Sequence, residues 1–141
     1  MRLPCLLVLA LLAAPLGAAA VEWYTVTGDK NDPSVDTTQL DVSTYKRRGA
    51  GSTVLRFRVN LASARVTPDR ETYQSYVSNI VVDCASGAIF HEHQLRYRDP
   101  LWEGPTREET FGQPKPMAFG GLSGDPRGRI LKLLCHARQG P

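Results

Sequence analysis

The cysteines offer the most direct chemistry in this 141-residue chain, which contains three of them. Cys5 lies in an apolar N-terminal segment, whereas Cys84 and Cys135 lie in the more polar remainder. Two cysteines in an oxidising compartment most simply form one bridge. We therefore predict a disulfide between Cys84 and Cys135. A bridged pair leaves neither sulfur free to act as a thiolate nucleophile.

The three histidines are a candidate set of zinc ligands. His91 and His93 are two residues apart, so on a β-strand they project to the same side, and His136 follows the second bridged cysteine. Three imidazoles with an open position suit Zn²⁺. The alternative is three satisfied, partly buried histidines on an otherwise apolar face. Because the spacing matches no recognised metal signature, we prefer this alternative and expect neither a metal ion nor a cofactor.

Four arginines and one tryptophan are candidates for contacting a partner. Arg56 and Arg58 lie on one predicted strand, and Arg96 and Arg98 lie on another. If these strands lie close together, their arginines form a cationic band for an acidic protein segment or an anionic glycan. Otherwise they simply solvate the outer face and discourage edge pairing. Trp102 either offers an aromatic contact on a long loop or packs down to cover the sheet.

No arrangement typical of an enzyme is present in the sequence. Residues 121–124 (GLSG) lack the glycine spacing of a nucleophile elbow, and no strand is predicted immediately before them. The carboxylates Glu103, Glu108 and Glu109 lie in a proline-rich segment, where nothing fixes the pair geometry that acid–base catalysis requires. We therefore expect a protein without catalytic activity.

Residues 1–20 have the features of a cleaved secretory signal peptide. Arg2 supplies the positive start, residues 5–14 form an apolar run, and Ala18 and Ala20 give the small-residue cleavage pattern. The run is shorter than the roughly 20 residues that span a bilayer. Cys5 lies too near the start to serve as a lipid-attachment site. We expect export through the inner membrane to the periplasm or the cell surface, without a stable membrane anchor.

Residues 21–141 are expected to form one domain, because neither repeats nor low-complexity stretches divide them. The formal net charge of the whole chain is +3. This excess is too small to indicate nucleic acid or a membrane surface as a partner. The sequence does not indicate an oligomeric state.

The segments that contain these candidate residues show mainly the sequence patterns of β-strands. Residues 21–27 (VEWYTVT) are rich in aromatic and β-branched side chains and precede a cluster of turn residues at 28–33. A short extended stretch is expected at 35–45, followed by a hairpin turn at 46–51. In residues 52–61, apolar and polar side chains alternate with the two-residue period of a half-buried strand.

Residues 72–84 and 88–98 are predicted to form a β-hairpin whose turn lies at Ser86 and Gly87. With a two-residue loop, Cys84 stands opposite Ile89. One apolar face would then contain the following side chains: Tyr76, Ser78, Ile80, Val82, Cys84, Ile89, His91, His93, Leu95 and Tyr97. Residues 99–121 contain four prolines and are expected to form a long loop, with one short edge strand near 106–111.

A C-terminal helix is predicted after residue 125. Asp125 is a suitable N-cap, Pro126 suits the first helical position, and the apolar residues from Ile130 to Ala137 follow helical spacing. Leu131 and Cys135 share a face of this helix, so a disulfide to residue 84 would press it onto the hairpin. The predicted fold class is α+β: a single antiparallel β-sheet of about five or six strands, with one C-terminal α-helix packed on a face and tethered by the disulfide.

The sequence from Trp23 to Cys135 resembles the surface-adhesin protein E-like domain of bacterial exported proteins. The matching features are Glu22-Trp23, Val35-Asp36, Tyr73-Gln74-Ser75 before an alternating strand, Asp83-Cys84, and the closing stretch Leu131-Lys132-Leu133-Leu134-Cys135. The resemblance implies an antiparallel sheet with a C-terminal helix held on one face by a disulfide, in agreement with the spacing. The resemblance indicates the fold more directly than it indicates the ligand, because proteins of one fold can have many functions.

For function, the resemblance implies a non-catalytic adhesin that binds a protein partner, such as the host matrix and plasma proteins vitronectin, laminin and plasminogen. Two alternatives stay open. The first is a periplasmic structural or envelope-maintenance protein on the same scaffold, which the lack of a lipid-attachment site favours. The second is the zinc-binding protein described above, using His91, His93 and His136.

Overall fold

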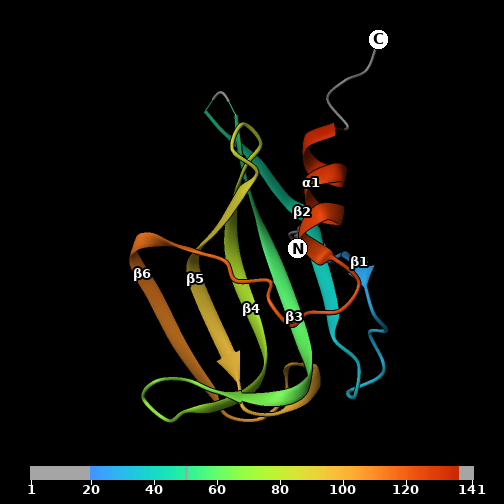
Figure 1. Ribbon diagram of the computed structural model, residues 1–141, viewed down its shortest axis with the longest axis vertical. Helices are drawn as coiled ribbons and strands as arrows, with labels where there is room; N and C mark the ends of the chain where they lie inside the picture. Colours follow the sequence, from blue (N-terminus) through green and yellow to red (C-terminus); the bar gives the residue numbers. More distant parts are fainter. Residues whose placement is uncertain (1–19, 50, 137–141) are drawn as a thin grey trace, which may run out of the picture.

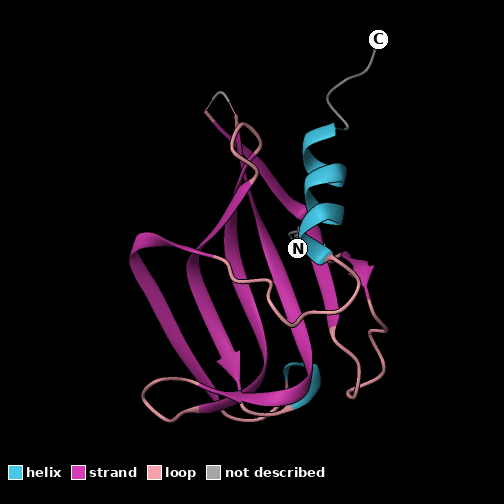
Figure 2. Ribbon diagram, viewed as in Figure 1, coloured by secondary structure: helices cyan, strands magenta, loops and turns pink. Residues whose placement is uncertain are grey.

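The computed structural model describes residues 20–49 and 51–136. These residues form one antiparallel sheet with a single helix, as the sequence predicted (Figures 1 and 2). The predicted signal peptide, including Cys5, lies outside the described residues except at its last position. The elements are β1 (Trp23–Thr27), β2 (Thr37–Arg48), β3 (Ser52–Val66), β4 (Thr72–Asp83), β5 (Ala88–Tyr97), the short 3-10 turn η1 (Pro100–Trp102), β6 (Thr106–Pro116) and α1 (Pro126–Cys135). Within the described ranges, no helix has the length and apolar character needed to cross a membrane.

The strands follow one another in a simple meander. Their order in the sheet is β1-β2-β3-β4-β5-β6, with every neighbouring pair antiparallel, so β1 and β6 are the two edges. β6 is longer than the short strand predicted within the 99–121 loop, since it continues to Pro116. The prolines in β6 are tolerated because an edge strand has a partner on only one side and needs fewer backbone donors.

The hairpin of β4 and β5 is confirmed, but its turn is longer than predicted. Asp83 pairs with Ala88, and the Gly87 N–H donates to the Asp83 carbonyl at 2.8 Å, so residues 84–87 form the loop. Cys84 therefore lies in this loop, and Ile89 pairs with Val82 instead. The Asp83 carboxylate holds the loop by accepting hydrogen bonds from the backbone of residue 85 and the hydroxyl of residue 86.

A β-bulge in β5 changes which residues face the core. Asn79 pairs with His93, but the next residue of β4, Ile80, pairs with His91, so Glu92 is an extra residue in β5. Beyond a bulge the two-residue alternation is shifted by one position. The prediction that His93, Leu95 and Tyr97 share the apolar face is therefore wrong. The residues of β5 that face inward, beside Tyr76, Ser78, Ile80 and Val82 of β4, are Ile89, His91, Gln94 and Arg96.

The helix α1 covers one face of the curved sheet, which we call the inner face; the opposite face is the outer face. The core lies between the helix and the inner face, and the chain after β6 crosses this face before it reaches α1 (Figure 1). Asp125 caps the helix as predicted, accepting from the Gly128 N–H at 3.1 Å. The buried apolar residues are Val26, Leu40, Leu55, Phe57, Val59, Leu61, Tyr76, Ile80, Val82, Ile89, Met117 and Ile130.

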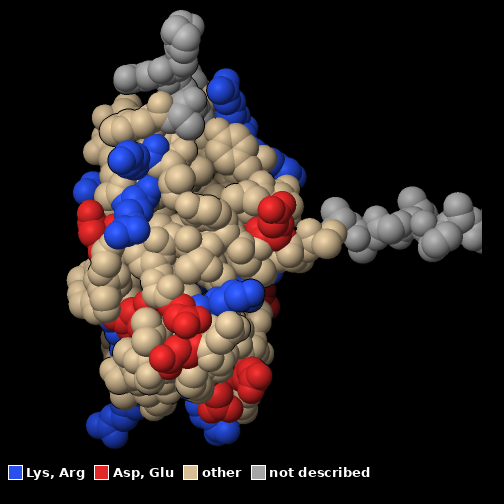
Figure 3. Space-filling view, turned by 90° about the vertical axis from the view of Figure 1, so that its right-hand side faces the viewer, with Lys and Arg blue, Asp and Glu red and all other residues tan. Residues whose placement is uncertain are grey.

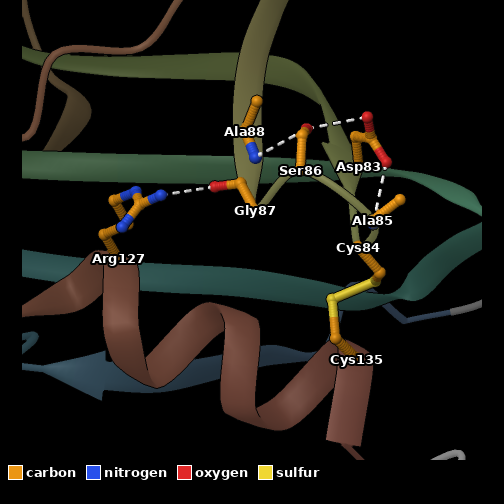
Figure 4. The surroundings of a disulfide bond; sticks show 8 residues. All are labelled: Asp83, Cys84, Ala85, Ser86, Gly87, Ala88, Arg127 and Cys135. Carbon is orange, nitrogen blue, oxygen red and sulfur yellow. Dashed lines mark hydrogen bonds between the residues drawn. A yellow bond between two sulfur atoms is a disulfide. The ribbon is translucent and has the colours of Figure 1, made fainter.

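The predicted disulfide joins the loop of the β4–β5 hairpin to the last turn of α1. The Cα atoms of Cys84 and Cys135 are 5.5 Å apart, within the usual range for a disulfide. At the other end of the helix, the Arg127 guanidinium donates to the Gly87 carbonyl at 2.7 Å (Figure 4). The same four-residue loop therefore holds both ends of α1 against the sheet.

Candidate functional site

A cluster of two tryptophans and one arginine lies on the outer face of the sheet. The Arg58 guanidinium carbon lies 4.2 Å from the ring centroid of Trp23 and 3.6 Å from that of Trp102. Trp23 comes from the edge strand β1, Arg58 from β3 and Trp102 from η1. An arginine close to two indole rings is stabilised by cation–π contacts. This cluster therefore ties three distant parts of the chain together.

A row of buried polar groups supports the cluster. The Arg58 Nε–H donates to Gln39 Oε1 at 2.7 Å, and Gln39 Nε2 donates to Thr25 Oγ1 at 2.8 Å. Beside this row, Arg56 lies 3.6 Å from the fully buried carboxylate of Asp41. Burial of the Arg58 guanidinium, followed by repulsion from the neighbouring arginine, lowers its pKa to about 10. Arg58 thus stays protonated at neutral pH.

The turn that carries Trp102 is fixed to the outer face by two buried polar side chains. Asn60 Oδ1 accepts from the Leu101 N–H at 2.8 Å, and Ser75 Oγ accepts from the Trp102 N–H at 3.0 Å. The Trp102 indole N–H also donates to the Tyr76 carbonyl at 3.3 Å. Trp102 thus packs onto the sheet, as one of the two sequence interpretations expected, and it keeps part of its surface exposed.

The predicted arginine band is divided by the β5 bulge. Arg56 and Arg58 share the outer face, but Arg96 points to the inner face, where its guanidinium donates to Glu109 at 2.7 Å and Glu71 at 3.3 Å. Burial alone would lower the pKa of Arg96, but the two carboxylates together outweigh it and raise the pKa. Arg98 follows β5 and lies 3.4 Å from Asp99. The four arginines therefore do not form one continuous surface.

The three histidines are also separated. His91 is buried on the inner face and its Nδ1 lies 2.7 Å from Ser78 Oγ, whereas His93 faces outward and contacts Glu108 at 2.5 Å. The expectation that these two project to the same side is corrected, because the extra residue between them reverses one side chain. His136 lies at the end of α1 beside Tyr24. Among the described residues, no cluster of three or more metal-binding side chains occurs.

The carboxylates considered as catalytic candidates are used elsewhere or lie apart. Glu108 contacts His93, and Glu109 forms an ion pair with Arg96. Glu103 is exposed and ends η1. The two paired carboxylates therefore serve as charge partners within the sheet.

A shallow groove between β1 and α1 is one hollow on the surface of the described residues. It has a volume of about 670 Å³ and is lined by Tyr24, Val26, Arg129, Lys132, Leu133 and His136. The side of the molecule that carries these two elements shows a broad uncharged area, with charged side chains of both signs around it (Figure 3). The groove is thus mainly apolar with a basic rim on the helix. Sequence reasoning missed it, because residues from both ends of the domain form it.

A second hollow lies on the inner face, between the curled end of β3 and the strands β4, β5 and β6. Its volume is about 590 Å³. Three rings of its lining follow one another: Tyr73 and Tyr76 are 6.4 Å apart, and Tyr76 and His91 are 6.0 Å apart. Phe111 lies next to this row, 6.2 Å from His91, with Lys115 over its ring. Charged side chains from four segments surround these rings.

Sequence reasoning also missed Trp23 as a partner of the arginines. The sequence places Trp23 on a strand, but only the sheet brings it beside Arg56 and Arg58. The available signal was the combination of an exposed aromatic residue on an edge strand with alternating arginines on another strand. That signal does not say which strands lie near each other.

Comparison with known proteins gives one family and one fold. The profile of the family described as "Surface-adhesin protein E" matches residues 23–136. The crystal structure of protein E from non-typeable Haemophilus influenzae is similar with a TM-score of 0.51 and 12% sequence identity, covering 89% of this chain and 82% of that chain. Crystal form II of Haemophilus influenzae protein E gives a TM-score of 0.46 at 12% identity, covering 71% and 80% of the two chains. No curated protein sequence matches this chain.

Proposed function

This chain belongs to the surface-adhesin protein E family, and from that membership we propose that it is an exported, non-catalytic binding protein that contacts a protein partner. The family profile covers nearly the whole described domain, including both bridged cysteines. At 12% identity, the structural likeness to protein E extends to the fold only. The contact surface must therefore be argued from this chain's own residues.

One observation carries the proposal: exposed large apolar side chains gather beside the groove between β1 and α1. Val21, Tyr24, Val42 and Leu133 are each at least 40% exposed. Tyr24 and Leu133 line the groove. Val42 donates its N–H to the Glu22 carbonyl at 3.2 Å, which places it next to the start of β1. A contiguous exposed apolar patch with a polar rim is typical of a protein interaction site.

The position of α1 favours an extended partner segment. β1 pairs with β2 on one side only, and α1 lies closest to β1 among the strands. A helix is about 10 Å wide, and strands in a sheet are about 4.8 Å apart, so a seventh strand added to β1 would lie beneath the helix. Such strand addition supplies main-chain hydrogen bonds, and the groove would receive the partner's apolar side chains. The basic rim of Arg129 and Lys132 favours acidic residues in that segment.

The outer face is the second candidate surface. It retains the predicted partner-binding residues Arg56, Arg58 and Trp102, now joined by Trp23. Two of the five predicted residues are less suited to this contact, because Arg96 is buried in ion pairs and Arg98 lies beyond the cluster. A charged partner bound here would be released by salt, whereas one held mainly by the apolar groove would be less sensitive.

The decisive experiment measures binding to immobilised vitronectin, laminin and plasminogen by surface plasmon resonance. We expect the double variant Tyr24→Ser, Leu133→Ser to lose about tenfold or more in affinity for any of these proteins that the unaltered chain binds. Val66→Ser is the matched control, because Val66 is 65% exposed at the far end of β3. Equal affinity of the double variant and the control would show that the groove between β1 and α1 is not the contact site. A loss of affinity in Arg56→Glu instead would indicate that the partner contacts the outer face.

Location separates the adhesin from the periplasmic alternative. We propose that residues 1–20 direct export, and that residues 21–141 then reach the cell surface. Protease treatment of intact cells should digest the domain while a periplasmic control protein stays whole. If the domain is protected until the outer membrane is opened, a structural or envelope-maintenance role in the periplasm becomes the better interpretation, and the partner is to be sought there.

A further inference from the structure

We propose that the hollow on the inner face is a binding site for a monosaccharide unit that carries a carboxylate, such as a uronic acid or a sialic acid. This hollow, which we call the inner groove, lies between the end of β3 and the strands β4, β5 and β6. Its volume of about 590 Å³ falls within the range of about 300–1,000 Å³ typical of small-ligand sites. It is separate from the groove between β1 and α1, so the two sites are testable independently.

Three acidic side chains in or beside the inner groove form ion pairs with arginines. Arg96 contacts Glu109 at 2.7 Å and Glu71 at 3.3 Å. Asp69 contacts the Arg107 guanidinium at 3.1 Å. Glu108, at the rim, contacts His93. Arg96 and Arg107 therefore offset most of the charge of Asp69, Glu71 and Glu109.

Two cations of the inner groove lack such a partner. Arg65, from the end of β3, and Lys115, from β6, form no ion pair within the part of the chain that the structure describes. Arg65 is paired across the strands with Tyr73, and Lys115 is paired with His91 and lies 5.2 Å from the ring centroid of Phe111, so both cations lie beside the aromatic rings. Two cations without a carboxylate partner in a concave site favour a ligand that supplies a carboxylate.

The neutral polar groups of the inner groove offer several donors and one clear acceptor. Ser78 Oγ donates to the His93 carbonyl at 2.7 Å, so its oxygen accepts from His91 Nδ1–H. This arrangement leaves His91 Nε2 as an acceptor. Gln94 Oε1 is engaged by Arg96, whereas its amide nitrogen has no acceptor among the described residues. The hydroxyl of Tyr73, also in the lining, adds a group able to donate or accept.

This combination fits an acidic sugar better than a simple anion. The carboxylate would lie near the two free cations, and the sugar hydroxyls would donate to His91 Nε2 and accept from Gln94 Nε2. The ring of Tyr73 lines the groove and suits the apolar face of a pyranose ring. A phosphate or sulfate ion would use the cations but leave the other polar groups and the aromatic rings without a partner.

The test is a titration of the purified, disulfide-bonded protein followed by two-dimensional amide NMR at constant ionic strength. The probes are sodium glucuronate, N-acetylneuraminate, glucose and inorganic phosphate. We expect one of the two acidic sugars to cause saturable shifts at residues 73, 91, 94 and 115, and to bind about tenfold or more tightly than glucose or phosphate. Which acid binds better distinguishes a uronate-containing polysaccharide from a sialylated glycan as the source.

Variants complete the test. Arg65→Gln with Lys115→Gln should weaken the binding of the acidic sugar about tenfold or more. The matched control is Lys46→Gln with Arg47→Gln, which removes the same two charges from the exposed end of β2. Four results would each overturn the proposal: no saturable shifts with either acid, equal binding of glucose, equal binding of phosphate, or unchanged affinity in the groove variant. Amide spectra of the variants without ligand verify that the fold is retained.

Discussion

The guanidinium of Arg58 lies over the indole of Trp102, with its central carbon 3.6 Å from the ring centroid. The ring centroid of Trp23 is 4.2 Å from the same carbon. These contacts join the first strand, the third strand and the turn after β5 on the outer face. Arg58 therefore mainly stabilises the fold. The neighbouring Arg56 is the more exposed positive charge for contact with a partner.

Replacing Arg58 tests whether its contacts with the two tryptophans stabilise the fold. Lysine keeps the charge but loses the guanidinium contact with both indoles and the hydrogen bond to Gln39 Oε1, so Arg58→Lys should lower the free energy of unfolding by about 1–2 kcal/mol. Urea titration monitored by tryptophan fluorescence measures this change. The matched control Arg47→Lys, on the exposed end of β2, should be nearly neutral. Equal free energies of unfolding for the two variants would contradict a stabilising role of Arg58.

The disulfide should contribute a large part of the domain's stability. Its cysteines are separated by 51 residues, for which chain entropy predicts a contribution of about 4 kcal/mol, reduced by any strain. We expect the double variant Cys84→Ala, Cys135→Ala to unfold at much lower urea concentration than the oxidised protein. A thiol assay of the denatured, unreduced protein should detect neither residue 84 nor residue 135. Two free thiols there would contradict the bridge.

Gly28 is required where β1 turns into the following loop. Its φ of +82° is unfavourable for other residues, and an added Cβ would lie 2.2 Å from the Asp36 carbonyl oxygen. Gly28→Ala should therefore lower the free energy of unfolding by about 2 kcal/mol or more. Gly112→Ala is the control, because a Cβ at Gly112, in β6, meets no atom within 4 Å. Similar urea midpoints for both variants would show that the loop after β1 can accommodate a side chain at position 28.

His91 should make the stability of the fold depend on pH. Burial, with a further contribution from Lys115, lowers the pKa of His91 to about 4, against 6.5 when exposed. Between these values the unfolded chain binds the extra proton, so this contribution is complete above pH 6.5 and is lost as the pH falls towards 4. The difference amounts to at most about 3 kcal/mol.

Urea titrations at pH 7, 5.5 and 4 measure this dependence. His91→Gln should flatten the loss of stability between pH 6.5 and 4, because glutamine does not titrate. His136→Gln, at the exposed end of α1, should keep the original pH dependence. An unchanged profile in His91→Gln would assign the dependence to other groups.

Much of the fold followed from local patterns in the sequence. The alternation in residues 52–61 indicated β3, the glycine at 87 indicated the β4–β5 hairpin, and Asp125-Pro126 indicated the start of α1. Each of these signals acts over a few residues, because strand alternation, turn conformation and helix capping are local properties. The pairing of Cys84 with Cys135 also followed, since only two cysteines remain outside the predicted signal peptide.

The candidate sites depended on tertiary structure. The bulge at Glu92 has no local signature, yet it turned Gln94 and Arg96 into the inner groove and separated His91 from His93. Likewise, only the order of the strands brings Trp23 to Arg58. The sequence by itself determined most of the elements, the disulfide and the family, because these depend on short-range pattern and residue type. The folded sheet decided which side chains meet, because one extra residue in a strand reverses every following side chain.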